Sequence, residues 1–349
     1  FEQGRPVIEA FRKACPGYKI LVTFFSPSGY EIRKNYPGAD YIFYLPPDTP
    51  RNVRRFMAIV RPKIAVFVKY KFWVNYLLAM KRAGTKLYLI SSIFRDGQIF
   101  FRPYGGLFRS ALRAFRHIFV QNDSSRNLLK SIGIEQVSVA GDTRFDRVYE
   151  IAQQAKRLPE IERFAADAPV FIAGSTWPPD EELLVGLIER YPDVKFIVAP
   201  HEIDPARIEK FCERISRPAL RYTQLTPQSD LAAAGVLFVD TIGILSSVYR
   251  YGRWGYIGGG FGAGIHNTLE AATFGLPLAF GPRYGKFREA RDLVTLRGAA
   301  SIASAEELER WFAGLHDDPD ATGRSGTICK EYVLQHKGAT ARIMDEICR

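Results

Sequence analysis

Short apolar runs alternate with amphipathic stretches along the whole chain. In the first part the apolar runs are residues 19–25, 41–44, 64–68, 86–91, 117–120 and 137–140, with helical patterns such as 50–60 and 73–83 between them. The second part has apolar runs at 170–174, 194–200, 236–240, 254–259, 276–281 and 299–303. Near-continuous apolar strands separated by helices predict parallel sheets covered on both faces. The predicted fold class is therefore α/β.

The length of 349 residues predicts two domains. The strand signal lapses between about residues 149 and 168, where the sequence becomes charged and helix-like. We therefore expect one Rossmann-like domain over residues 1–150 and a second over residues 151–349, with the C-terminal helix in the second.

Composition narrows the class of protein. Hydrophobic residues make up 47% and charged residues 24%, as in an ordinary globular protein. No uncharged apolar stretch approaches the ~18 residues needed to cross a bilayer. The four cysteines form no CxxC pair, which favours a reducing compartment over a disulfide framework and argues against structural zinc.

The positive charge is concentrated in the first part of the chain. Residues 1–150 carry a net charge of +14 and the remainder −3, within a total of +11. Five of the cations surround the predicted helix 50–60, namely Arg51, Arg54, Arg55, Arg61 and Lys63. Such a field attracts phosphorylated substrates or anionic lipid headgroups. Nucleic acid is disfavoured as a partner because no binding motif accompanies the charge.

The stretch 256–288 is the strongest candidate for chemistry. A predicted strand enters five glycines within residues 258–264, and a helix then opens near Asn267. Glycines let backbone N–H groups approach a phosphate, and the helix start favours negative charge. The loop is not GxGxxG, and Glu270 comes early enough to meet the ribose of a single nucleotide. Asn267 and Glu270 also fit a capping pattern, and that alternative remains open.

Polar clusters follow most of the predicted strands, where ligands collect in open α/β sheets. They are residues 26–29, 91–92, 142–144, 174–176, 200–202 and 240–243. Some members are expected to be helix caps, for example Thr176 before Pro178 and Asp204 before Pro205.

Seven motifs in this order resemble those of the 3-deoxy-D-manno-octulosonate (Kdo) transferases. They are residues 24–31 (FFSPSGYE), 44–56 (YLPPDTPRNVRRF), 141–148 (GDTRFDRV), 173–182 (AGSTWPPDEE), 239–245 (VDTIGIL), 258–272 (GGGFGAGIHNTLEAA) and 280–290 (FGPRYGKFREA). The resemblance implies the GT-B fold, two Rossmann-like domains facing across a cleft. It also implies inverting transfer of Kdo from CMP-Kdo to a lipid A precursor, lipid IVA, in lipopolysaccharide core synthesis at the cytoplasmic face of the bacterial inner membrane.

The resemblance assigns residues to both substrates. Donor contacts would come from Ser175, Thr176, His201, Gly243, Gly259, Gly260, His266, Asn267 and Glu270, with Asn267 at the phosphate and Glu270 at the ribose. In the first domain, Ser28 and Gly29 would face the acceptor. Arg95 and Arg144 would neutralise its phosphates or the donor carboxylate, or else form internal salt bridges.

Two departures from the family stand out. Many members carry an acidic residue after the third strand, where this chain has Lys69 and Lys71. The family's general base, a Glu, would directly precede Phe1, and Glu2 has the wrong offset to replace it. We expect that the natural N-terminus, with any membrane anchor, is missing and that this chain binds donor but transfers Kdo poorly.

No metal or other cofactor is expected, because the five histidines form no HxH or HxxxH and CMP has no diphosphate for a cation to bridge. Two alternatives remain open. One is a GT-B enzyme with another nucleotide-sugar donor, and the other is a non-catalytic module that binds anionic glycolipid.

Overall fold

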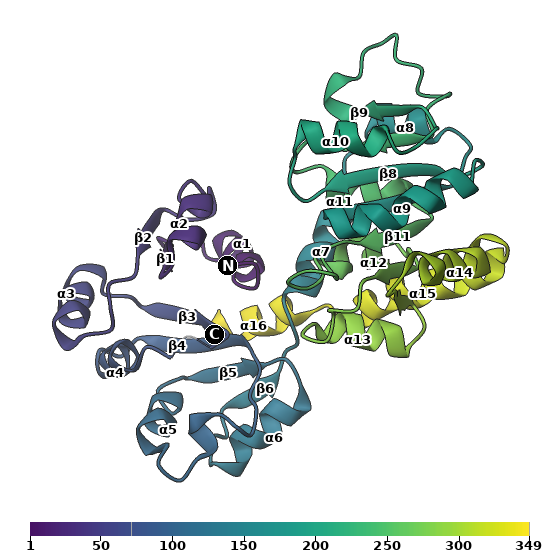
Figure 1. Cartoon of the computed structure of the whole chain (residues 1–349). Helices are drawn as coiled ribbons and strands as arrows, with labels where there is room; N and C mark the ends of the chain where they lie inside the picture. The colour runs from purple at the N-terminus through teal and green to yellow at the C-terminus, as the bar shows by residue number, and fades with distance from the viewer. Residues whose placement is uncertain (71, 349) are drawn as a thin grey trace. The chain divides into compact units, whose positions relative to one another are not determined.

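The computed structural model describes residues 1–70 and 72–348, and the chain divides into two compact units (Figure 1). The first unit comprises Phe1–Arg147 and His336–Arg349, and the second comprises Val148–Gln335. Each unit is built on parallel strands, which confirms the predicted α/β class. The chain leaves the first unit three residues before the expected boundary at 150.

The first unit contains two separate parallel sheets rather than one. The larger has the order β3-β4-β5-β6, and β1 pairs only with β2. The strands are β1 (Leu21–Phe24), β2 (Tyr41–Tyr44), β3 (Ile64–Val68), β4 (Lys86–Ser92), β5 (His117–Val120) and β6 (Val137–Val139). All six lie where the apolar runs predicted strands.

Helices cover the sheets of the first unit. They are α1 (Arg5–Ala14), α2 (Pro27–Arg33), α3 (Pro50–Val60), α4 (Val74–Arg82), η1 (Ile99–Phe101), α5 (Gly106–Leu112), α6 (Asp123–Ser131), α7 (Arg144–Gln153), which crosses into the second unit, and α16 (Ala339–Ile347). Helix α3 illustrates how sequence sets the limits. Thr49 caps its first turn, Pro50 supplies a preset φ, and left-handed Arg61 ends it.

The assignment of the C-terminal helix to the second domain is wrong. Helix α16 packs in the first unit, where Ile343, Met344 and Ile347 join a buried cluster with Val7 of α1 and Ile90 of β4. The physical reason is that one face of the sheet would otherwise expose strand residues such as Ile90.

The second unit holds one seven-stranded parallel sheet in the order β13-β12-β11-β7-β8-β10-β9. Its strands are β7 (Val170–Thr176), β8 (Lys195–Pro200), β9 (Ala219–Arg221), β10 (Val236–Phe238), β11 (Trp254–Ile257), β12 (Leu278–Phe280) and β13 (Ala299–Ser301). Strand β9 was not predicted, because its three half-buried residues carry no apolar run. Every residue of β8 and β11 is buried.

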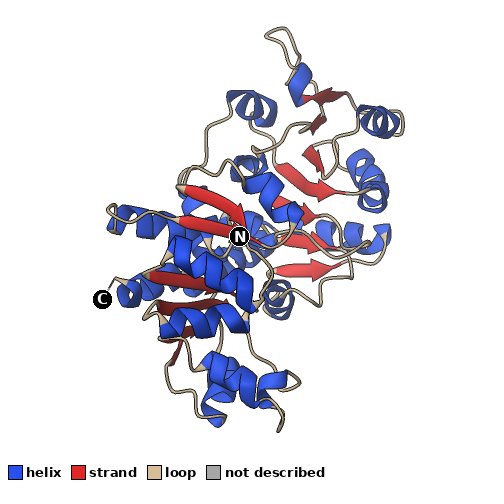
Figure 2. Cartoon of the chain, turned by 90° about the vertical axis from the view of Figure 1, so that its left-hand side faces the viewer, coloured by secondary structure: helices blue, strands red, loops and turns tan. Residues whose placement is uncertain are grey.

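The remaining helices belong mainly to the second unit, and Figure 2 shows them against the strands. They are α8 (Pro159–Ala165), α9 (Pro178–Arg190), α10 (Pro205–Cys212), η2 (Tyr222–Gln224), α11 (Leu245–Val248), η3 (Tyr249–Tyr251), α12 (Thr268–Thr273), α13 (Arg288–Thr295), α14 (Ala305–His316) and α15 (Pro319–His336).

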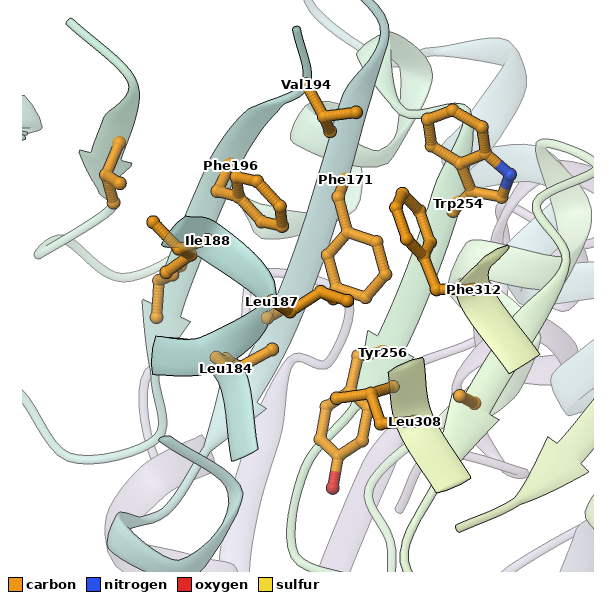
Figure 3. Packing of buried hydrophobic residues seen from close by; sticks show 14 of the residues in the cluster. Phe171, Leu184, Leu187, Ile188, Val194, Phe196, Trp254, Tyr256, Leu308 and Phe312 are labelled. Carbon is orange, nitrogen blue, oxygen red and sulfur yellow. The ribbon is translucent and has the colours of Figure 1, made fainter. Parts of the chain in front are cut away.

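The core of the second unit is aromatic. Phe171 of β7 and Trp254 of β11 both pack edge-on against Phe312 of α14, while Leu184 and Leu187 of α9 join the same cluster (Figure 3). Burial of such side chains stabilises a fold by about 1.5–3 kcal/mol each. Phe171 and Trp254 lie near the amino ends of β7 and β11, and the candidate site begins at the opposite ends of these strands.

Candidate functional site

The order of strands reverses beside β7 in the second unit. From β7 the chain adds β8 on one side, and it later returns to add β11, β12 and β13 on the other. At such a switch point the loops that follow the two central strands diverge and leave room for a ligand. The polar cluster 174–176 ends β7 and the glycine run 258–264 follows β11, so the structure brings together two of the predicted segments.

Close backbone approach explains the glycines at this point. A Cβ on Gly258 would overlap the carbonyl oxygen of Ser175, and one on Gly260 would come within 2.5 Å of Gly281 Cα. Gly259 has a φ of +91°, which favours glycine. Ser175 also adopts a positive φ, of 55°, where β7 shifts register against β8. Positions 258 and 260 of this junction therefore have no room for a Cβ.

A buried carboxylate that sequence analysis missed anchors the glycine run. Asp180, in the first turn of α9, is fully buried and accepts hydrogen bonds from the Gly259 N–H (2.9 Å), the Trp177 N–H (2.9 Å) and the Tyr256 hydroxyl (2.7 Å). Burial and this carboxylate raise the pKa of Tyr256 far above its usual value. The position of Asp180 three residues into a helix was visible in the sequence as a capping signal, but not its reach to the loop.

Thr176 lies in a different environment from the one expected. Its side chain is buried and its hydroxyl donates to Glu181 Oε1 at 3.0 Å, so it supports α9 instead of facing open space. It is also not the helix cap, because Trp177 occupies that position and Asp180 bonds its N–H. Burial raises the pKa of Glu181. By contrast Asp204 caps α10 as predicted.

Three rings gather beside the glycine run. The His201 ring stacks on His266 at a centroid distance of 4.2 Å and on Trp177 at 4.9 Å. Trp177 Nε1 donates to His266 Nε2 at 3.1 Å, which assigns the proton of neutral His266 to Nδ1. Burial, with a smaller contribution from His201, lowers the pKa of His266. The structure thus brings together His201 and His266, which lie 65 positions apart, in one aromatic wall.

Asn267 caps α12, so the capping interpretation is confirmed for this residue. Its Oδ1 accepts from the Leu269 N–H at 3.2 Å, and its Nδ2 donates to Glu270 Oε1 at 2.9 Å. Asn267 is nevertheless exposed and Glu270 is half-buried. Capping therefore does not remove either side chain from the surface beside the glycine run.

Gly243 lies farther along the same edge of the sheet. It has a φ of +94° and is exposed, in the loop after β10 that leads to the short helix α11. Asp240, at the start of this loop, is buried and accepts from Arg221 Nε and from the Thr223 hydroxyl and N–H. In the strand order, β10 is separated from β7 by β8.

The residues predicted for the first unit all follow strand ends. Ser28 and Gly29 lie in the first turn of α2, where Ser28 is exposed and donates to Ser26 at 3.3 Å. Arg95 follows β4 and is exposed. Arg144 opens α7, and its Nε donates to Asp142 Oδ2 at 2.9 Å. The internal salt bridge that sequence analysis left open for Arg144 is therefore present.

A polar cluster near Arg144 was not predicted. The Gln3 side-chain oxygen accepts from Lys69 Nζ (3.0 Å) and from Arg144 Nε (3.3 Å). Lys69 and Ser91, at the ends of β3 and β4, both have positive φ values, 62° and 51°. Such strained backbone is enriched at functional sites. Lys71 lies outside the described residues, and the Glu2 carboxylate pairs with Arg33.

Within residues 1–70 and 72–348, no group of three or more His, Cys, Asp or Glu side chains is arranged to hold a metal ion. In the same part of the chain, every helix is too short or too polar to cross a bilayer. Independence from metals stays a prediction.

The comparisons with known proteins agree with these motifs. Residues 1–147 match the family model described as 3-deoxy-D-manno-octulosonic-acid transferase (kdotransferase). The 3-deoxy-D-manno-octulosonic acid transferase of Haemophilus influenzae is 23% identical over 97% of this chain and 82% of its own length. The enzyme of that name from Aquifex aeolicus is 25% identical over 86% of this chain and 78% of its own length.

The fold is shared more widely. The UDP-GlcNAc 2-epimerase of Neisseria meningitidis, solved bound to UDP-GlcNAc, has a TM-score of 0.69 at 16% identity and covers 99% of this chain and 96% of its own. At this identity the likeness establishes the fold alone, two Rossmann-like domains of the GT-B type. The motifs, the family model over residues 1–147 and the relatives thus agree that this chain resembles the Kdo transferases along most of its length.

Proposed function

We propose that this chain transfers Kdo from CMP-Kdo to the lipid A precursor lipid IVA, with inversion at the anomeric carbon. The observation that carries the proposal is the anchored glycine run at the switch point of the second unit. Asp180 holds the Gly259 N–H, and Gly258 and Gly260 pack against neighbouring backbone. A loop fixed in this way can present backbone N–H groups to a phosphate without reorganising, which is how electrostatic stabilisation is most effective.

In this proposal the CMP phosphate lies beside Gly259 and Gly260, near Ser175. The Gly259 N–H stays bonded to Asp180, so Gly259 shapes the loop and its neighbours supply the N–H donors. Asn267 and Glu270 meet the phosphate and the ribose hydroxyls, because a carboxylate accepts two hydrogen bonds from a diol. The exposed His201 ring offers a flat surface toward the nucleotide. Thr176 contributes through its backbone, since its side chain is buried.

The chemistry is direct displacement of CMP by an acceptor hydroxyl. A base must remove the hydroxyl proton as the bond forms. Backbone N–H groups and cationic side chains stabilise the charge that develops on the departing phosphate. A single phosphate leaves no diphosphate for a cation to bridge, so we propose that the reaction needs no metal.

The first unit supplies the acceptor side of the proposal. Arg51, Arg54, Arg55, Arg61 and Lys63 are exposed, and within the described residues none of them forms a salt bridge. Ile59, on the same helix α3, is 78% exposed. A surface that combines cations with apolar groups suits a phosphorylated, acylated acceptor and anionic lipid. We place the enzyme at the cytoplasmic face of the bacterial inner membrane.

Calorimetric titration with CMP and with UDP tests the donor. We expect CMP to bind, UDP to bind more weakly, and EDTA to change neither result. Glu270→Ala should weaken CMP binding by about 1–3 kcal/mol, the contribution of hydrogen bonds to a charged acceptor. Glu306→Ala is the matched control, because Glu306 is an exposed carboxylate in the first turn of α14.

The two alternatives predict other results. Preference for UDP would favour a transferase or epimerase with a UDP-sugar donor. Absence of binding by either nucleotide would favour a glycolipid-binding module. If Glu270→Ala left the CMP affinity unchanged but lowered the melting temperature, Glu270 would support the Asn267 cap and would not bind the nucleotide.

A further inference from the structure

Two of the four cysteines are neighbours in space although 333 positions separate them. Cys15 directly follows α1 and Cys348 directly follows α16, and their Sγ atoms lie 3.7 Å apart. Both are free thiols. The two helices belong to the same compact unit and share a buried cluster that includes Val7 and Ile347. The distance between the thiols is thus set by packed helices.

The surroundings of the pair make it accessible and well positioned. Cys348 is exposed and Cys15 is half-buried. Each backbone N–H is bonded to its own helix, Cys15 to the Phe11 carbonyl and Cys348 to the Met344 carbonyl. Sulfur atoms approach to about 2 Å in a disulfide, a displacement that rotation of two side chains can supply.

The other two cysteines lie in the second unit, where Cys212 is half-buried like Cys15. Cys329 is fully buried, and its Sγ donates to the Gly298 carbonyl at 3.0 Å. Cys212 ends α10 in the second unit. These two residues therefore serve as internal references for the reactivity of the pair.

We propose that Cys15 and Cys348 are a thiol–disulfide modification site that joins the two ends of the first unit. Both are thiols under reducing conditions, and a small disulfide such as oxidised glutathione is the oxidant. The Cys348 thiolate attacks one sulfur of that disulfide, which forms a mixed disulfide and releases one glutathione thiol. The Cys15 thiolate then attacks the Cys348 sulfur and releases the second. Two electrons and two protons pass from the protein to glutathione.

The bond would close a loop over nearly the whole chain. Helix α16 is the segment with which the chain returns to the first unit, so the bond would fasten this segment to α1. A cross-link between distant positions stabilises mainly by restricting the unfolded chain. Asp180 and the glycine run belong to the other unit.

The test compares the full chain incubated with oxidised glutathione and with dithiothreitol. Intact mass should show the loss of two hydrogen atoms per chain, and peptide mapping should join the peptides of Cys15 and Cys348. The melting temperature of the oxidised chain should rise by at least about 4 °C. Cys15→Ser and Cys348→Ser should each abolish the mass loss and the rise, whereas Cys212→Ser should retain both.

Other products would overturn the proposal. A stable glutathione adduct with both cysteines present would show that the second exchange does not occur. A disulfide-linked dimer would show that the thiols react between chains. A mass loss that persists in Cys348→Ser would assign the bond to other residues.

Discussion

The carboxyl ends of the strands are built differently in the two units. In the second unit β8 and β11 are buried throughout, and Gly258 and Gly260 close their loop against neighbouring backbone. In the first unit β1 and β2 form a sheet of their own, and three of the four β2 residues are exposed. In the second unit the loop after β11 is therefore held by close backbone packing. In the first unit β2 exposes aromatic side chains instead.

Exposed apolar side chains follow the same division. Among the described residues, the large hydrophobic side chains that are exposed in the first unit are Tyr18, Phe25, Ile32, Tyr41, Phe43, Tyr44, Ile59, Val66, Tyr70, Tyr104 and Leu107. In the second unit they are Ile203, Ile242 and Leu296. A small anionic ligand needs preorganised donors, and a large acylated one needs contact area. The difference is what the proposed donor and acceptor roles require.

Removal of Asp180 should have the largest effect on the second unit. Asp180→Ala leaves the Gly259 and Trp177 N–H groups and the Tyr256 hydroxyl without their acceptor. We expect the free energy of unfolding to fall by about 3–5 kcal/mol, since each buried donor left unsatisfied costs about 1–3 kcal/mol. CMP binding should be lost as well. Urea denaturation and calorimetry measure the two effects.

Tyr256→Phe is the matched control for that variant. It removes one of the three hydrogen bonds and leaves both backbone donors bonded to Asp180. The loss of stability should be about 1 kcal/mol, with CMP binding retained. Equal losses in the two variants would mean that the Tyr256 bond, and not the anchoring of the loop, determines the effect of Asp180.

The sequence predicted where the strands and helices of both units lie better than it predicted which of these elements pack together. Strands β2, β3 and β5 coincide with the apolar runs. Burial explains the run of β5, in which three of four residues are buried, but not that of β2, in which three of four are exposed. Helix α16 was misplaced, because an amphipathic helix shows that it packs but not on which sheet. The split of the first unit into two sheets leaves no local signal either.

The candidate site shows the same limit. The glycine run was visible because backbone packing excludes every other residue there. Asp180 was missed because its bond to Gly259 spans 79 positions, and local patterns identify only its link to Trp177. Thr176 was misread because a hydroxyl before a helix serves equally as a cap or as a buried partner of Glu181.

Neutralising α3 should affect the first unit alone. The triple change Arg51→Gln, Arg54→Gln and Arg55→Gln should weaken binding to phosphatidylserine vesicles by about 3 kcal/mol, since each cation near an anionic surface contributes about 1 kcal/mol. The effect should shrink as salt is raised. Vesicle sedimentation at several salt concentrations measures it.

The control changes three exposed cations of the second unit to Gln. We choose Lys210, Arg291 and Arg310. Their loss should alter vesicle binding little and leave the salt dependence unchanged. Equal weakening by the two triple variants would show that net charge, and not the surface of the first unit, determines membrane binding.

Substitution of single glycines by alanine should lower stability by different amounts at the strand ends of the two units. Gly260→Ala brings a Cβ against Gly281 backbone, which cannot retreat, so we expect a loss of about 1–3 kcal/mol in stability. In the first unit, the Cβ of Gly29→Ala would lie 2.9 Å from the Phe24 ring. That ring can move aside, so we expect a smaller loss of stability. Gly285→Ala has no neighbour within 4 Å and serves as the control. A Gly29 effect as large as that of Gly260 would contradict the comparison.

The smallest expected effect is a pH dependence of opposite sign in the two units. Hydrogen bonds to Asp317 and Asp193 raise the pKa of His316 above 6.5, whereas burial beneath the first unit's surface lowers the pKa of His117. The stability due to His316 is full below pH 6.5 and is lost as pH rises through its folded pKa. The stability due to His117 is full above pH 6.5 and is lost as pH falls toward its lower folded pKa.

The test measures the free energy of unfolding of His316→Gln and of His117→Gln against the parent chain from pH 5 to 8. Each variant should differ from the parent by about 1 kcal/mol or less, and the two differences should change with pH in opposite directions. Slopes of the same sign would show that one of the two assignments is wrong.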